Sequence, residues 1–112
     1  MVTLRVDQAM TGFVTLARVA DVPPGAIFEA ELDGESLLIV NAGGELFACD
    51  ALCTHLDGPL AQGTLDGAVL RCPWHGSAFD LRSGAVLNRP ARTPLACFAL
   101  TVADGEIRVA RG

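Results

Sequence analysis

Apolar residues alternate with polar ones, or form short runs, between about positions 13 and 110. Turn dipeptides that contain glycine separate these runs, among them Asp33-Gly34, Gly43-Gly44 and Asp104-Gly105. A period of two, bounded by such turns, is typical of short β-strands that are joined by hairpins. The pattern predicts strands over residues 13–18, 26–32, 36–41, 45–49, 68–72, 95–103 and 106–110.

The same pattern contains no helix of useful length. No segment of twelve or more residues combines a helical period with capping residues at both ends. Short strands at this spacing predict an all-β fold, a small antiparallel barrel or sandwich. With 112 residues and 51% apolar side chains, the chain can form one hydrophobic core without disulfides. We therefore expect a single domain over residues 1–112.

The net charge and the lengths of the apolar runs argue against some classes of partner and some cellular locations. The net charge of −5 disfavours nucleic acids and anionic membrane surfaces as partners. No apolar run approaches the roughly 18 residues that span a bilayer, and Arg5 and Asp7 interrupt the N-terminal segment, which does not resemble a signal peptide. We expect a cytoplasmic protein without a membrane partner, in which clustered cysteines more often bind metal than form disulfides.

Two short fragments carry the candidate chemistry. One begins at Cys53 and reads C-T-H, and the other begins at Cys72 and reads C-P-W-H. Together they contain both histidines of the chain, His55 and His75, and two of its four cysteines. The sixteen residues between His55 and Cys72 allow a strand out and back. The two pairs could therefore meet at the tips of adjacent loops.

Three interpretations of these pairs compete. Ordinary core residues would require both histidines to follow a cysteine closely by chance. A structural zinc site usually takes like ligands in pairs, as in C-x2-C and H-x3-H, whereas each loop here supplies one of each kind. A [2Fe–2S] cluster in which two histidines replace two cysteines on one iron accounts for both fragments. The last interpretation is favoured.

The fragments resemble the signature of the Rieske family, which is C-x-H followed some residues later by C-x-x-H. This chain supplies the four positions as Cys53, His55, Cys72 and His75. Gly76 and Ser77 follow the second histidine as they do in the family. Residues 88–95 resemble the family's proline-containing loop, with Arg89 where glycine is more usual. The likeness extends from about residue 13 to residue 110.

The resemblance implies a cofactor and a role for each residue. Cys53 and Cys72 would bind the inner iron of one [2Fe–2S] cluster through their thiolates, and His55 and His75 would bind the outer iron through Nδ1. The hydroxyl of Ser77 could donate to a bridging sulfide. The cluster would lie in a subdomain of two loops, at about residues 50–88. Because neutral imidazoles replace two thiolates, the oxidised cluster is formally neutral and accepts an electron more readily than a four-thiolate cluster.

Departures from the family pattern are informative. High-potential members have two further cysteines, at positions that correspond to Gly58 and Trp74, and a tyrosine where this chain has Phe79. This chain can form neither the disulfide nor the hydrogen bond of that tyrosine. Fewer donors stabilise the reduced cluster less. The resemblance therefore implies a reduction potential in the lower part of a range of very roughly −150 to +300 mV.

Other residues have plainer interpretations. Cys49 and Cys97 are expected to be small buried apolar residues. Trp74 either shields the cluster or forms an apolar docking contact. Arg89 and Arg92 would lie near the cluster if the proline-containing loop covers it.

The function implied is electron transfer without a substrate of its own. A Rieske oxygenase also needs a mononuclear iron held by two more histidines and a carboxylate, and both histidines are already assigned. The resemblance implies a soluble Rieske-type ferredoxin, which is an electron carrier and not an enzyme. It would take single electrons from an NAD(P)H-dependent flavoprotein reductase and deliver them to a terminal oxygenase, a ring-hydroxylating dioxygenase. The alternatives are a small subunit of an assimilatory nitrite reductase and a zinc-stabilised protein-interaction module.

Overall fold

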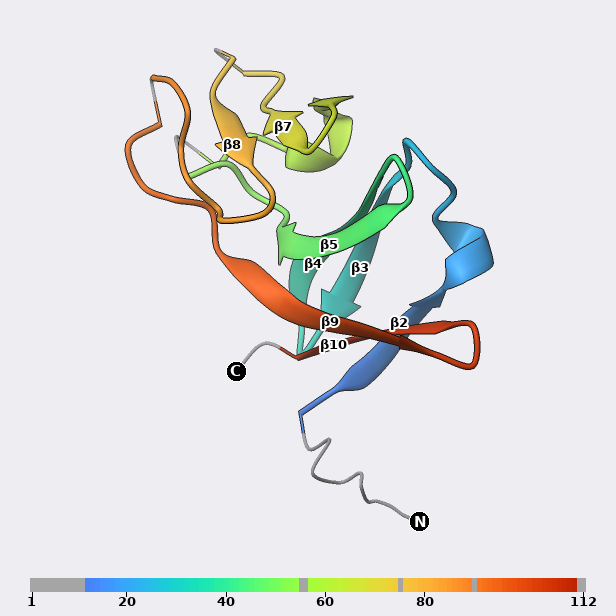
Figure 1. The fold of residues 1–112 in the computed structure, drawn as a ribbon. Helices are drawn as coiled ribbons and strands as arrows, with labels where there is room; N and C mark the ends of the chain where they lie inside the picture. Colours follow the sequence, from blue (N-terminus) through green and yellow to red (C-terminus); the bar gives the residue numbers. More distant parts are fainter. Residues whose placement is uncertain (1–11, 55–56, 75, 90, 111–112) are drawn as a thin grey trace.

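The computed structural model describes residues 12–54, 57–74, 76–89 and 91–110, which form two antiparallel sheets (Figure 1). The large sheet has the strand order β2 (Val14–Arg18), β10 (Glu106–Ala110), β9 (Cys97–Ala103), β5 (Glu45–Asp50), β4 (Glu35–Ala42) and β3 (Ile27–Leu32). The small sheet contains β6 (Thr64–Asp66), β7 (Val69–Arg71) and β8 (Ala78–Asp80). Two short 3₁₀ turns, η2 (Val19–Asp21) and η3 (Leu60–Gln62), complete the described elements.

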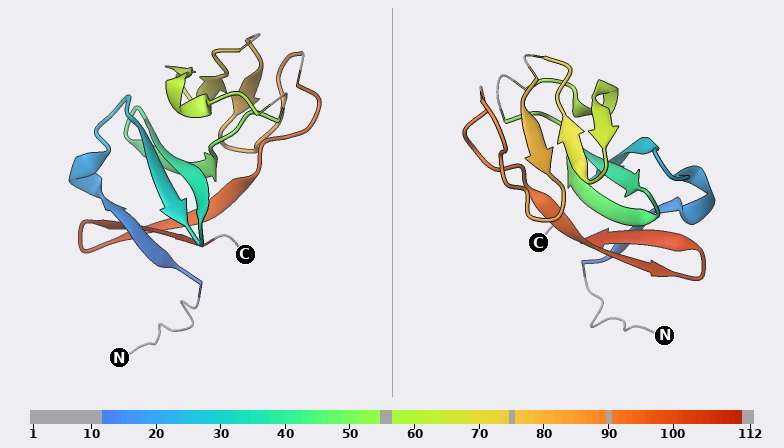
Figure 2. Two further views of the ribbon diagram at one scale, coloured as in Figure 1. Left: turned by 180° about the vertical axis from the view of Figure 1, so that it is seen from behind. Right: turned by 45° about the horizontal axis from the view of Figure 1, so that its top comes forward.

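The large sheet curls into a near-barrel. Strands β2 and β3 stand at opposite ends of the strand order, and yet they contact each other (Figure 2). The prediction of an all-β, antiparallel fold is confirmed. The seven predicted strands are present with ends shifted by two residues at most, whereas β6 and β8 were not predicted.

Strand β4 explains how the two sheets share their packing. Its residues Leu37 and Ile39 join the hydrophobic cluster inside the curl, and Leu38 and Val40 join a second cluster beneath the small sheet. Successive side chains of a strand point to opposite faces. A continuous apolar run is therefore expected where both faces are covered. The small sheet thus packs on the large sheet through the second cluster.

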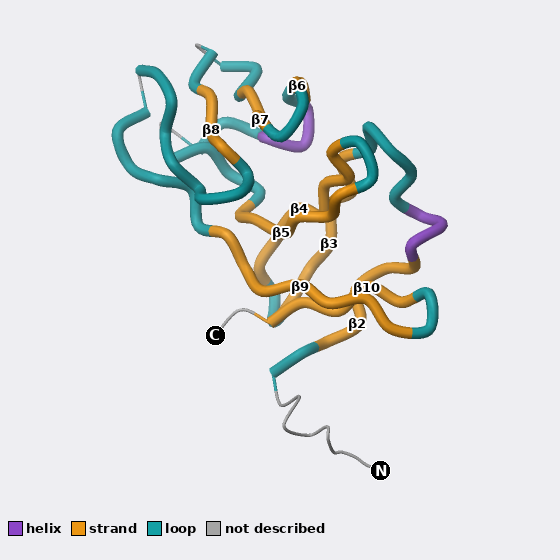
Figure 3. The backbone as a smooth tube through the Cα atoms, viewed as in Figure 1, coloured by secondary structure: helices purple, strands orange, loops and turns teal. Residues whose placement is uncertain are grey.

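Long loops make up most of the end of the molecule that carries the small sheet (Figure 3). We call residues 51–63, between β5 and β6, the first cysteine loop, and residues 72–77, between β7 and β8, the second cysteine loop. Residues 81–96, between β8 and β9, are the arginine loop. No helix in the described part of the chain is long and apolar enough to cross a membrane.

Candidate metal centre

Both cysteine loops close in the same way. The N–H of Cys53 donates to the carbonyl of Gly58 at 2.8 Å, and the N–H of Cys72 donates to the carbonyl of Ser77 at 2.7 Å. In each case the acceptor is the fifth residue after the cysteine. Cys53 and Cys72 therefore have equivalent positions, each at the start of a segment that closes on the fifth residue after it.

The two thiols are buried next to each other. Cys53 is 1% exposed and Cys72 is 2% exposed, and neither forms a disulfide. Burial raises the pKa of Cys72, the N–H of Trp74 opposes this by donating to its Sγ at 3.4 Å, and the neighbouring Cys53 raises the pKa further. A metal ion that binds here would have to displace a proton that burial otherwise retains.

Gly58 provides the space in which the second thiol lies. A Cβ atom at this position would be 2.6 Å from the Sγ of Cys72 and 3.4 Å from Cε3 of Trp74. Residues 58 and 74 are thus neighbours in space, at the positions where high-potential members have their two further cysteines. Neither is a cysteine in this chain, so these loops are not joined by a disulfide there.

Polar side chains hold the arginine loop on the first cysteine loop and on the start of strand β8. The hydroxyl of Thr54 donates to the carbonyl of Thr93 at 2.7 Å, and the N–H of Ala78 donates to Oδ1 of Asn88 at 2.7 Å. Sequence analysis missed both contacts. Their partners are 39 and 10 residues apart, and neither contact belongs to a local motif.

Ser77 lies where the second cysteine loop meets the arginine loop. Its side chain is fully buried, and its Oγ accepts a hydrogen bond from the N–H of Ala91 at 3.0 Å. Because Oγ serves as the acceptor in that contact, the hydroxyl hydrogen remains available for a second acceptor. This geometry is compatible with the predicted donation to a sulfide.

The predicted ligands His55 and His75 lie outside the described residues. Within the described residues there is no group of three or more His, Cys, Asp or Glu side chains that could hold a metal ion. The part of the predicted ligand set that can be described is the thiol pair of Cys53 and Cys72. A buried thiol pair, an N–H donor to one sulfur and a hydroxyl with a free hydrogen fit the cysteine side of a Rieske cluster.

The other cysteines differ from each other. Cys49 is buried in the core, as predicted, and burial raises its pKa well above the usual range. The prediction that Cys97 is buried is wrong, because this residue is exposed. Cys97 begins β9 and pairs with Cys49 at the end of the β5–β9 ladder, where only two residue pairs form.

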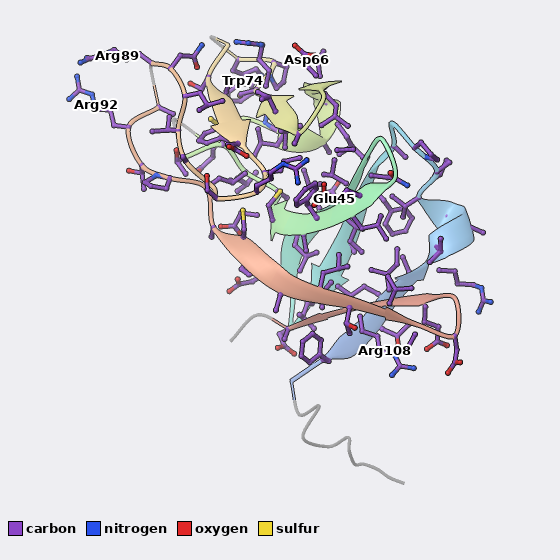
Figure 4. The ribbon with its side chains drawn as sticks, viewed as in Figure 1. Glu45, Asp66, Trp74, Arg89, Arg92 and Arg108 are labelled. Carbon is purple, nitrogen blue, oxygen red and sulfur yellow. The ribbon has the colours of Figure 1, made fainter. Side chains whose placement is uncertain are left out.

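Trp74, Arg89 and Arg92 lie at the end of the molecule that carries the cysteine loops (Figure 4). Trp74 is 47% exposed, although one edge of its ring lies over Gly58. The ring edge and the second thiol thus both lie beside Gly58, while the ring also offers an apolar surface to solvent. Both arginines are exposed, and they extend outward from the arginine loop.

Comparison with known proteins agrees with this geometry. The model of the Rieske [2Fe-2S] domain matches residues 12–99. The ferredoxin CarAc of Metapseudomonas resinovorans is 34% identical over 88% of this chain and 92% of its own length. The ferredoxin component of the p-cumate 2,3-dioxygenase system of Pseudomonas putida is 37% identical over 89% of this chain and 86% of its own.

A solved structure supports the same assignment. It is a chain from the complex of reduced oxygenase and oxidised ferredoxin in carbazole 1,9a-dioxygenase, and it superposes with a TM-score of 0.83 at 34% identity. The superposition covers 88% of this chain and 93% of the other. The relatives are named as ferredoxins, which are electron carriers and not enzymes. From its fold, its buried thiol pair and these matches, we conclude that the chain belongs to the Rieske [2Fe–2S] family and is of the ferredoxin type found in dioxygenase systems.

Proposed function

We propose that this protein carries single electrons from an NAD(P)H-dependent flavoprotein reductase to the terminal oxygenase of a ring-hydroxylating dioxygenase system. The observation that carries the proposal is the buried thiol pair of Cys53 and Cys72, each in a segment that closes on the fifth residue after the cysteine, in a chain that spans most of the length of ferredoxin relatives. These relatives favour this role over a nitrite reductase subunit or a zinc-stabilised module. The proposed location is the cytoplasm.

The proposed ligand set is the one that the sequence predicts. Cys53 and Cys72 bind one iron of a single [2Fe–2S] cluster, and His55 and His75 bind the other. When bound, such a cluster accepts and releases one electron at a time. The cluster-binding subdomain covers about residues 50–88 of a single domain over residues 1–112.

The protein's own residues protect and tune that site. Trp74 and the backbone of Gly58 pack at the second thiol and exclude water from it. The N–H of Trp74 donates to Sγ of Cys72, and a donor to a sulfur favours its anionic form. Ser77 offers its hydroxyl from a buried position, where a hydrogen bond is stronger than in water.

Stopped-flow absorption spectroscopy tests this role in two steps. Oxidised protein is mixed with a flavoprotein reductase and NAD(P)H, and the reduced protein is then mixed with a terminal oxygenase. We expect bleaching of the visible bands in the first step and their return in the second. Failure of every NAD(P)H-dependent reductase to reduce the protein, or of every ring-hydroxylating oxygenase to reoxidise it, would show that the proposed role is wrong.

A further inference from the structure

The charges of this chain are unevenly distributed. The whole chain has 13 acidic residues and 8 arginines, but residues 81–103 contain three arginines and no Asp or Glu. Of the three, Arg82 is paired with Glu45. Arg89 and Arg92 have no ion-pair partner among the described residues. An uncompensated basic pair therefore lies on the surface of an otherwise acidic protein.

This pair is fixed next to the cysteine loops. Ala91, which lies between the two arginines in the sequence, donates its N–H to Oγ of Ser77 at 3.0 Å. The carbonyl of Thr93, the residue after Arg92, accepts the hydroxyl of Thr54 at 2.7 Å. Figure 4 shows both arginine side chains pointing away from the molecule at this end. The backbone that carries the arginines is thus hydrogen-bonded to both loops that carry the predicted ligands.

An apolar residue and a shallow hollow accompany the arginines. The hollow has a volume of about 410 Å³ and is lined by Val86, Leu87, Asn88, Arg89, Ala91 and Arg92. Leu87 is 52% exposed. Protein interfaces are enriched in arginine and have an apolar centre inside a polar rim. The hollow could receive the carboxylate side chain of a partner, since an arginine forms strong paired hydrogen bonds with a carboxylate.

We propose that Arg89, Arg92 and Leu87 form the docking surface for an acidic face of the electron-donating flavoprotein reductase. The proposal rests on the proposed function. Charge complementarity of this kind raises the rate of encounter and orients the partner. The acidic remainder of the chain adds to this by repelling an acidic partner that approaches from elsewhere.

The direction of electron flow favours the donor over the acceptor as the partner of this surface. Under the proposed ligand set the oxidised cluster would be formally neutral, and reduction would add one negative charge between the two loops to which the arginine-bearing backbone is hydrogen-bonded. That charge weakens the attraction of Arg89 and Arg92 for an acidic face. An acidic donor would therefore bind the oxidised protein more tightly and would dissociate after transfer. An acidic acceptor has to bind the reduced protein, and it would be attracted less strongly to that form than to the oxidised one.

The test compares two double variants with equal net charge. Arg89→Gln with Arg92→Gln removes the proposed surface. Arg18→Gln with Arg82→Gln removes two arginines outside it: Arg18 ends strand β2, and Arg82 lies in the arginine loop but is paired with Glu45. The reductase is one that reduces the wild-type protein, and the second-order rate constant is measured by stopped flow at low and at high salt. We expect the first variant to be slower by about tenfold at low salt and close to wild type at high salt. The control should stay within about twofold of wild type at both.

Further measurements test whether a lower rate comes from the loss of the positive charges, from the choice of partner or from a change in the fold. Arg89→Lys with Arg92→Lys should restore most of the rate, and iron content should equal that of wild type in every variant. The wild-type protein should bind the reductase more tightly when oxidised than when reduced. Equal rates for the two Gln double variants, or a defect confined to transfer to the oxygenase, would overturn the proposal. If no reductase reduces the wild-type protein, the proposed function fails and this docking surface fails with it.

Discussion

Strand β4 and the second cysteine loop bury their residues by different means. In β4, Leu37 and Ile39 pack into one hydrophobic cluster while Leu38 and Val40 pack into another. The thiol of Cys72 also belongs to the second of these clusters, but a backbone hydrogen bond across the base of the loop and the close approach of a glycine act on it in addition. Apolar packing supports the side chains of Leu37 and Ile39, whereas directed backbone contacts add to the packing of the thiol. The stability of the fold and the binding of iron should therefore respond to different substitutions, and variants can test this.

The largest effect is expected when a cysteine is removed from the loop. In Cys72→Ala we expect complete loss of bound iron, since the proposed inner ligand is gone, while the far-ultraviolet circular dichroism spectrum still shows β-sheet. The matched control is Cys49→Ala, a buried cysteine of strand β5. This control should keep its iron and lose some stability. Full iron occupancy in Cys72→Ala would contradict the ligand assignment.

The opposite result, a loss of stability without a change at the site, is expected when a side chain is shortened in the hydrophobic cluster inside the curl. Ile39→Ala should lower the free energy of unfolding by about 2–5 kcal/mol, because Ile39 is completely buried in the cluster that does not contain Cys53 or Cys72. The visible spectrum of the native protein should stay the same. Val102→Ala is a control, since Val102 is 47% exposed. Denaturant titration measures both, and a changed visible spectrum in Ile39→Ala would show that fold and site are coupled.

Alkaline pH should weaken the sheet through Cys49. Burial raises the pKa of this thiol, so it stays protonated in the folded protein and ionises in the unfolded chain near its ordinary pKa of about 8.5. Unfolding then releases a proton, and stability falls as the pH rises above that value. Cys49→Ala should reduce this slope by up to about 1.4 kcal/mol per pH unit. The measurement is denaturant unfolding at several pH values between neutral and alkaline, and equal slopes would contradict the argument.

The smallest effect is expected when a single hydrogen bond between two loops is removed. Thr54→Val removes the hydrogen bond to the carbonyl of Thr93, and a net loss of about 0.5–1.5 kcal/mol is expected. Because Thr54 lies in the first cysteine loop, loss of iron to a chelator should become faster. Thr15→Val, which removes the exposed contact of Thr15 with Glu106, should leave that rate unchanged. Equal rates of iron loss in the two variants would show that this hydrogen bond does not support the site.

The sequence predicted the parts of the molecule that follow from local patterns of residues. Alternation and glycine turns located seven strands, and the spacing of Cys53 and Cys72 located the thiol pair that the structure buries. Strands β6 and β8 were missed, since neither lies in a run that shows a pattern, whereas the equally short β7 lies within the mainly apolar run of residues 68–72. The exposure of Cys97 was also missed, because it depends on where β5 stops pairing with β9 and not on the apolar run around it.

The central claim is that the two unlike fragments hold one cluster with two histidine ligands. Electron paramagnetic resonance of the purified, reduced protein, combined with iron and sulfide analysis, tests it most directly. The account predicts two irons and two acid-labile sulfides per chain, as in any [2Fe–2S] cluster, and a rhombic signal with the low average g value of histidine ligation. A colourless protein with stoichiometric zinc, or a signal typical of four cysteine ligands, would contradict it.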